Sequence, residues 1–111
     1  MSTRQEGAGT VLEVAGDLDM STTPQLRDRL REVVEGGTRV VVVDLTGVGF
    51  MDSSGLGALV VAYRDLQQRD GWLGLAGVRR SVRTVFSITS VDQVIGIYDT
   101  VRDAEEAAPV S

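Results

Sequence analysis

The residue types best suited to chemistry gather in one segment, Asp52-Ser53-Ser54-Gly55. This segment joins the most apolar run of the chain, residues 40–43, to an amphipathic segment over residues 56–68. Two hydroxyls and a carboxylate therefore lie where a buried strand is expected to lead into a helix N-terminus. In α/β proteins that position commonly binds ligands, phosphates and partners. Because Asp and Ser are also favoured helix N-caps, capping alone is a second interpretation of the same residues.

The residue types that the chain lacks exclude most catalytic interpretations of this segment. The sequence contains no histidine, no cysteine and no lysine. Without histidine a Ser-His-Asp relay cannot form, and Asp52 stands where a hydrolase elbow needs its first glycine. A phosphate-binding P-loop needs a lysine after its glycine. We therefore predict a protein that is not an enzyme and that has no catalytic residue, no cofactor and no metal site.

A serine that accepts a phosphate needs no catalytic partner in its own chain, only exposure and a kinase. A phosphate on Ser53 or Ser54 would add about −1.5 to −2 charges beside the free N–H groups of the helix. The helix dipole would stabilise that charge by roughly 0.3–1 kcal/mol, so the fold should persist. The modification would instead change the surface and repel a partner that presents acidic groups there.

The overall composition limits the partners that the protein can have. The formal net charge of −5 argues against nucleic-acid binding, which requires a basic surface. No run of about 18 apolar residues exists, so no membrane span is predicted. Residues 1–9 lack the apolar centre of a signal peptide. We expect a cytoplasmic protein that contacts neither nucleic acid nor a membrane.

Strand-forming and helix-forming segments alternate along the chain, which predicts a single α/β domain. A helix is expected after each predicted strand, and the predicted strands are residues 10–15, 39–45, 72–76 and 94–98. Such strand–helix–strand units make neighbouring strands parallel. The expected fold is therefore a central, mostly parallel sheet of about four strands with about four helices.

Parallel strands bring their carboxyl ends to one edge of a sheet. The loop over residues 16–20 and the turn over residues 47–54 should therefore lie side by side, which places Asp19 next to the serine pair. The domain is expected to span residues 10–108. Residues 1–9 are polar, and we expect either an N-terminal tail or a degenerate edge strand there.

Three parts of the sequence resemble the STAS family, and specifically the bacterial anti-sigma-factor antagonists. The segment Phe50-Met51-Asp52-Ser53-Ser54-Gly55-Leu56-Gly57 closely resembles the family signature. Gly16-Asp17-Leu18-Asp19 is similar to a second landmark, and residues 94–108 resemble the C-terminal end of the family. The likeness covers residues 10–108 and implies a STAS-like fold.

In that family, an unphosphorylated antagonist binds an anti-sigma factor that is also a serine kinase, and so releases the sigma factor. The kinase phosphorylates the serine immediately before the glycine of the motif, and a serine phosphatase removes the phosphate. On this chain the resemblance implies Ser54 as the phosphorylated residue, with Asp52, Ser53 and Gly55 in the recognised turn. It also implies that Asp19 lies in the face that binds the partner.

Two other functions are compatible with the same fold. The first is an unregulated STAS module that serves as a scaffold in a stress-signalling or transporter assembly. The second is a small-ligand or nucleotide-binding domain that uses the helix N-terminus after Asp52.

Overall fold

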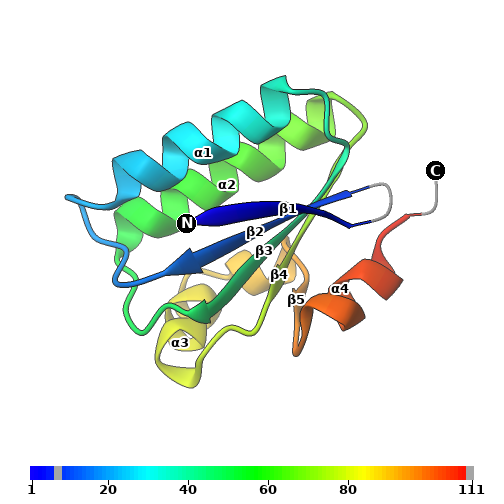
Figure 1. Ribbon diagram of the computed structural model, residues 1–111. Helices are drawn as coiled ribbons and strands as arrows, with labels where there is room; N and C mark the ends of the chain where they lie inside the picture. Colours follow the sequence, from blue (N-terminus) through cyan, green and yellow to red (C-terminus); the bar gives the residue numbers. More distant parts are fainter. Residues whose placement is uncertain (7–8, 110–111) are drawn as a thin grey trace.

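A five-stranded sheet runs through the middle of the computed structural model, which describes residues 1–6 and 9–109 (Figure 1). The strands lie in the order in which they occur in the chain: β1 (Ser2–Glu6), β2 (Gly9–Ala15), β3 (Val40–Gly47), β4 (Trp72–Ala76) and β5 (Ile97–Tyr98). β1 pairs with β2 in antiparallel fashion, and every other neighbouring pair is parallel. The predicted α/β fold with a mostly parallel sheet is confirmed.

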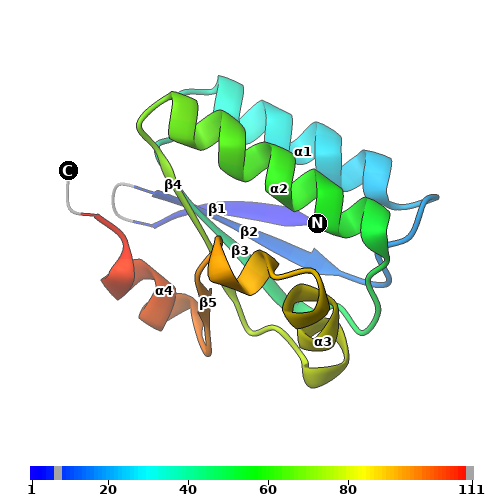
Figure 2. The ribbon, with the colours of Figure 1, turned by 180° about the vertical axis from the view of Figure 1, so that it is seen from behind.

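The helices cover both faces of this sheet. They are α1 (Thr23–Glu35), α2 (Ser53–Gln68), α3 (Arg80–Ile88) and α4 (Val101–Ala107). Figures 1 and 2 show α1 and α2 side by side over one face, with α4 on the other. None of these helices, in the part of the chain that the structure describes, has both the length and the hydrophobicity needed to cross a membrane.

The uninterrupted valine run of β3 is buried from both sides. Val41 and Val43 belong to the larger core beneath α1 and α2, whereas Val42 belongs to the smaller core beneath α4. Successive side chains of a strand point to opposite faces, so a strand covered on both sides is apolar at consecutive positions. This explains why β3 lacks the alternating pattern of a half-exposed strand. It also makes β3 a rigid support for the turn that follows it.

The N-terminal residues form an edge strand, the second of the two expected alternatives, so the sheet has five strands rather than about four. β1 is polar and mostly exposed, and Arg4 forms ion pairs with Glu6 beside it and with Glu13 on β2. Residues 7 and 8, which belong to the segment predicted as a tail or edge strand, lie outside the described residues. Charged side chains on an edge strand discourage further strand pairing.

The last predicted strand is shorter than residues 94–98. Only Ile97–Tyr98 pair with β4, and a 3₁₀ turn over Val91–Gln93 precedes them. Ser90 adopts a left-handed conformation with φ of 62°, which turns the chain out of α3. Ile95 is buried in the larger core while Val94 is exposed, so the apolar run here packs as an irregular segment and not as a strand.

Candidate functional site

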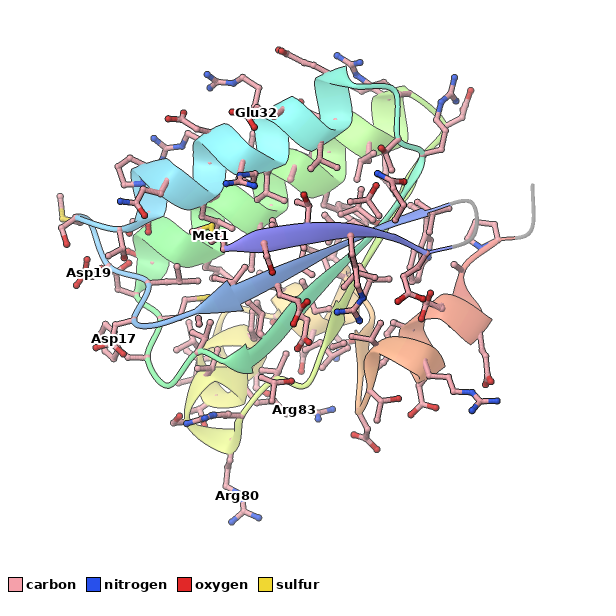
Figure 3. All side chains as sticks on the ribbon, viewed as in Figure 1. Met1, Asp17, Asp19, Glu32, Arg80 and Arg83 are labelled. Carbon is pink, nitrogen blue, oxygen red and sulfur yellow. The ribbon has the colours of Figure 1, made fainter. Side chains whose placement is uncertain are left out.

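Two loops meet at the carboxyl ends of the parallel strands, as predicted. We call this surface the rim and define it as residues 16–22 and 48–54. The Leu18 N–H donates to the Phe50 carbonyl at 2.9 Å, and the Asp52 N–H donates to the Leu18 carbonyl at 3.0 Å. These bonds form a short parallel bridge between Leu18 and Met51. In Figure 3, Asp17 and Asp19 lie on the loop of the rim that follows β2.

Asp52 caps α2, so the capping interpretation is correct for this residue. Its backbone is extended, and its Oδ1 accepts from the Ser54 N–H at 2.8 Å and from the Gly55 N–H at 3.3 Å. The Ser54 hydroxyl also donates to the same oxygen. The Ser54 hydroxyl is the largest of the influences that lower the pKa of Asp52. Asp52 is therefore an ionised carboxylate that only accepts hydrogen bonds at neutral pH.

The Ser54 hydroxyl belongs to a directed chain of hydrogen bonds. It lies 3.0 Å from the Thr23 hydroxyl, which comes from the first residue of α1 and is buried. Because Ser54 donates its only hydroxyl proton to the Asp52 carboxylate, Thr23 must be the donor to Ser54. The chain thus runs from Thr23 through Ser54 to Asp52 and ties the first turns of α1 and α2 together. Ser54 itself is partly buried.

Ser53 has different surroundings from its neighbour. It is exposed and is the first residue of α2. Within the described part of the chain its hydroxyl takes part in no hydrogen bond. Ser53 therefore presents a free hydroxyl to solvent at a helix N-terminus, where the positive end of the helix dipole favours a negative group.

Asp19 organises the other loop of the rim. Its Oδ1 accepts from the Ser21 hydroxyl at 2.7 Å, from the Ser21 N–H at 2.9 Å and from the Thr22 N–H at 3.2 Å. The Ser21 hydroxyl is the first cause that lowers the pKa of Asp19. The negative charge of Asp19 also raises the pKa of Asp52, although less than the hydrogen bonds lower it. The two carboxylates are thus brought together, as the parallel strands predicted.

Gly55 allows α2 to approach the loop after β2. A Cβ atom on Gly55 would lie 3.0 Å from Leu18 Cβ and 3.0 Å from Met51 Cγ. Both of these neighbours are buried, so neither side chain can move aside easily. The absence of a side chain at position 55 therefore sets how closely the two loops of the rim pack.

Sequence reasoning missed four residues of this site. Thr23 lies 31 residues from its partner Ser54, so no local pattern links the two. Met20 and Phe50 are large apolar residues that remain 80% and 51% exposed on the rim. Arg79 donates from Nε to the Thr46 carbonyl at 2.8 Å, which fastens the start of α3 to the end of β3. Exposure and long-range contacts of this kind leave no local pattern in the sequence.

The rim can present a serine hydroxyl, but it does not resemble a metal centre. Among residues 1–6 and 9–109, no group of three or more Asp, Glu, His or Cys side chains is placed to hold a metal ion. The carboxylates of Asp19 and Asp52 instead accept hydrogen bonds from their own loops. The arrangement is that of a rigid surface with one free hydroxyl.

Comparison with known proteins agrees with this geometry. The family model for the STAS domain matches residues 1–104. An anti-sigma-B factor antagonist from Staphylococcus aureus is 35% identical over 86 residues, which cover 78% of this chain and 80% of that protein. A crystal structure of an anti-sigma factor antagonist from Mycobacterium paratuberculosis superposes with a TM-score of 0.89 at 29% identity. The match covers 96% of this chain and 91% of the chain from Mycobacterium paratuberculosis.

The anti-sigma factor antagonist SpoIIAA shares the fold in two forms. The structure of its unphosphorylated form matches with a TM-score of 0.81 at 22% identity, covering 95% of this chain and 92% of that one. The structure of the phosphorylated form of the same Bacillus protein matches with a TM-score of 0.73 at 21% identity, covering 95% and 96%. The family model spans nearly the whole chain, and the signature segment forms the turn that begins α2. The chain is a member of the STAS domain family.

Proposed function

We propose that the protein is an anti-sigma-factor antagonist that binds an anti-sigma factor with serine kinase activity and is switched off by phosphorylation on the rim. The observation that carries the proposal is the exposed Ser53 hydroxyl at the N-terminus of α2, beside two ionised carboxylates. Relatives that match most of the chain are anti-sigma-B factor antagonists, which supports the same role here. The proposal gives the catalytic step to the partner, and it implies a cytoplasmic location, where sigma factors act.

The geometry supports Ser53 as the residue that accepts the phosphate. Its hydroxyl is exposed and has no hydrogen bond to break within the described structure, so it can enter a kinase active site without a change of fold. Ser54, which the resemblance implies, is partly buried and is bonded to Thr23 and Asp52. A phosphate on Ser54 would break both bonds and would lie against the Asp52 carboxylate, where like charges repel. Ser54 is therefore the competing assignment.

The transfer itself requires little of this chain. A bond would form between the Ser53 Oγ and the γ-phosphorus of ATP while the bond from that phosphorus to ADP breaks, and the hydroxyl proton would pass to a base of the kinase. This chain supplies an oriented acceptor. The Asp52 cap, the Thr23–Ser54 bond and the buried residues beneath α2 hold that acceptor in place.

Phosphorylation would weaken the complex by charge. A kinase holds the phosphates of its nucleotide beside the acceptor hydroxyl, so a new phosphate of about −1.5 to −2 charges would lie among like charges. Such juxtaposition at an interface costs several kcal/mol, and about 1.4 kcal/mol is a factor of ten in affinity. A serine phosphatase that removes the phosphate would restore binding.

The decisive experiment combines phosphorylation with site mapping. The protein is incubated with ATP and with each purified anti-sigma factor encoded in the same genome, and the modified residue is identified by mass spectrometry. We expect one phosphate on Ser53, which is lost in Ser53→Ala and retained in Ser54→Ala. Ser81→Ala is the matched control, because Ser81 is also an exposed serine in the first turn of a helix.

Each other outcome has a clear meaning. Phosphate found on Ser54 would return the assignment to the residue that the resemblance implies, and would contradict the argument from exposure. An anti-sigma factor that binds the protein but transfers no phosphate would favour the unregulated scaffold. Heat released on titration with nucleotide alone would instead favour a nucleotide-binding domain.

A further inference from the structure

Two exposed apolar side chains stand out on the rim. Large hydrophobic residues are normally buried, and six are exposed in the described part of the chain: Met1, Met20, Phe50, Val61, Ile88 and Val94. Met20 and Phe50 belong to the two loops that flank the serine pair, with exposures of 80% and 51%. Neither residue belongs to the larger core, whereas Leu18 and Met51 in the same two loops do.

The backbone holds both residues firmly. The Phe50 carbonyl accepts from the Leu18 N–H at 2.9 Å, and the next residue, Met51, is only 2% exposed. On the other loop, the carbonyl of Asp19 accepts from the Thr23 N–H at 2.8 Å, so the backbone on the N-terminal side of Met20 is fixed to the start of α1. Because the backbone is already ordered, binding a partner costs the entropy of ordering the two side chains but little further backbone entropy.

The charges around this pair define the chemistry of its partner. Asp17 and Asp19 lie on the same loop as Met20, and Asp52 is two residues after Phe50. The hydrogen bonds described above keep Asp19 and Asp52 ionised at neutral pH. A surface that covers this region must offer an apolar recess, and it must border that recess with basic side chains opposite the carboxylates.

We infer that Met20 and Phe50 form a two-residue apolar anchor that inserts into a recess, bordered by arginine or lysine, on the anti-sigma factor. This inference rests on the proposed function and adds which residues supply affinity. A few well-placed aromatic or apolar residues carry most of the affinity of a typical interface, while the charges around them set specificity and the rate of association. The anchor supplies the affinity, and phosphorylation of Ser53 on the same rim prevents binding.

The test measures the affinity of the full chain for the anti-sigma factor that binds the wild-type protein in the phosphorylation experiment. The variants are Met20→Ser and Phe50→Ser, compared by isothermal titration calorimetry in the absence of ATP. Ile88→Ser and Val94→Ser are matched controls, because these residues are also exposed, at 78% and 59%. Ile88 ends α3 and Val94 follows it, whereas α3 contacts the rim through its first turn, where the Ser81 hydroxyl donates to the Gly49 carbonyl. Melting temperatures of all four variants are measured alongside.

We expect each rim variant to weaken binding by about tenfold or more, and each control to change it by less than about twofold. All four should melt close to the wild-type temperature, because every replaced side chain is exposed. Wild-type affinity in both rim variants would overturn the anchor and leave the proposed function intact. Equal losses in rim and control variants would also overturn it. If no anti-sigma factor bound even the wild-type protein, the proposed function and the anchor would fall together.

Discussion

A negative charge introduced at position 53 meets different surroundings from one introduced at position 54. Ser53→Asp places a carboxylate in solvent at the N-terminus of α2, where the dipole favours it. Ser54→Asp removes the hydroxyl that donates to the Asp52 carboxylate and sets two carboxylates against each other. We expect the free energy of unfolding to fall by about 1–3 kcal/mol in Ser54→Asp and to stay near the wild-type value in Ser53→Asp. Urea denaturation of both variants measures this difference, and equal stabilities would contradict the directed hydrogen-bond chain.

The capping carboxylate should make part of the stability depend on pH. The pKa of Asp52 is lower in the folded protein, chiefly because the Ser54 hydroxyl donates to it. The stabilisation is therefore complete above the pKa of the unfolded chain, and it is lost as the pH falls through the lower folded pKa. We expect Asp52→Asn to flatten the acid side of the stability profile between neutral pH and the acid transition. Chemical denaturation at a series of pH values measures the slope.

Asp28→Asn provides the control for that experiment. Asp28 is exposed, and in the described structure its carboxylate accepts no hydrogen bond. Comparison of the two variants therefore separates the loss of the cap from the loss of one negative charge. The carboxylate of Asp19 is also held by hydrogen bonds, so a residual acid dependence in Asp52→Asn is expected from Asp19. An unchanged slope in Asp52→Asn would mean that folding does not lower the pKa of Asp52, and would contradict the hydrogen bonds that its carboxylate accepts.

At the scale of the element, α2 carries two glycines whose surroundings differ. Gly55 is pressed against Leu18 and Met51, whereas a Cβ on Gly57 would meet nothing within 4 Å. We expect Gly55→Ala to lower the free energy of unfolding by about 1–3 kcal/mol through overpacking. Gly57→Ala should raise it by about 0.5–1 kcal/mol, because alanine favours the helix. Thermal denaturation of the pair tests both signs, and a stable Gly55→Ala would refute the close approach of α2 to the rim.

The elements differ in how well their sequences predict them. β3 and β4 are apolar runs with clear ends, and α2 has both a capping residue and an apolar stripe, so local pattern was sufficient. β1 is polar and has a strand partner on one side only, so it is a strand because it pairs with β2 and not because of its own sequence pattern. The apolar residues 94–98 looked like a strand, but packing of Ile95 into the core interrupts it.

The features of the site also differ in how well the sequence predicts them. Parallel strands were enough to predict that Asp19 lies beside the serine pair, because chain order alone fixes which loops share an edge. Ser53 is exposed, whereas Ser54 is partly buried and its hydroxyl lies beside Thr23 of α1. No pattern within the segment distinguishes two adjacent serines, so that distinction required the tertiary structure.

For the whole molecule, the proposed switch predicts a change of surface without a change of fold. Ser53 lies outside both cores, so a phosphate on it should leave the sheet and the helix packing as they are. We expect hydrogen exchange of the phosphorylated protein to match that of the unmodified protein, except for slower exchange of amides in the first turn of α2. Faster exchange in α1 or β3 would instead indicate a conformational switch.

The antiparallel pairing of β1 has a practical consequence for how the protein is handled. Ser2 lies opposite Glu13, near the carboxyl end of β2, so the first residue lies on the side of the sheet that carries the rim. At the other end of the sheet, the last turn of α4 lies near the carboxyl end of β1 (Figures 1 and 2). Burial and the carboxylate of Glu6 raise the pKa of Glu105 there. A tether on the amino terminus of this chain would stand next to the rim and obstruct the proposed docking surface, whereas attachment after α4 would leave the rim facing the solution on a sensor chip.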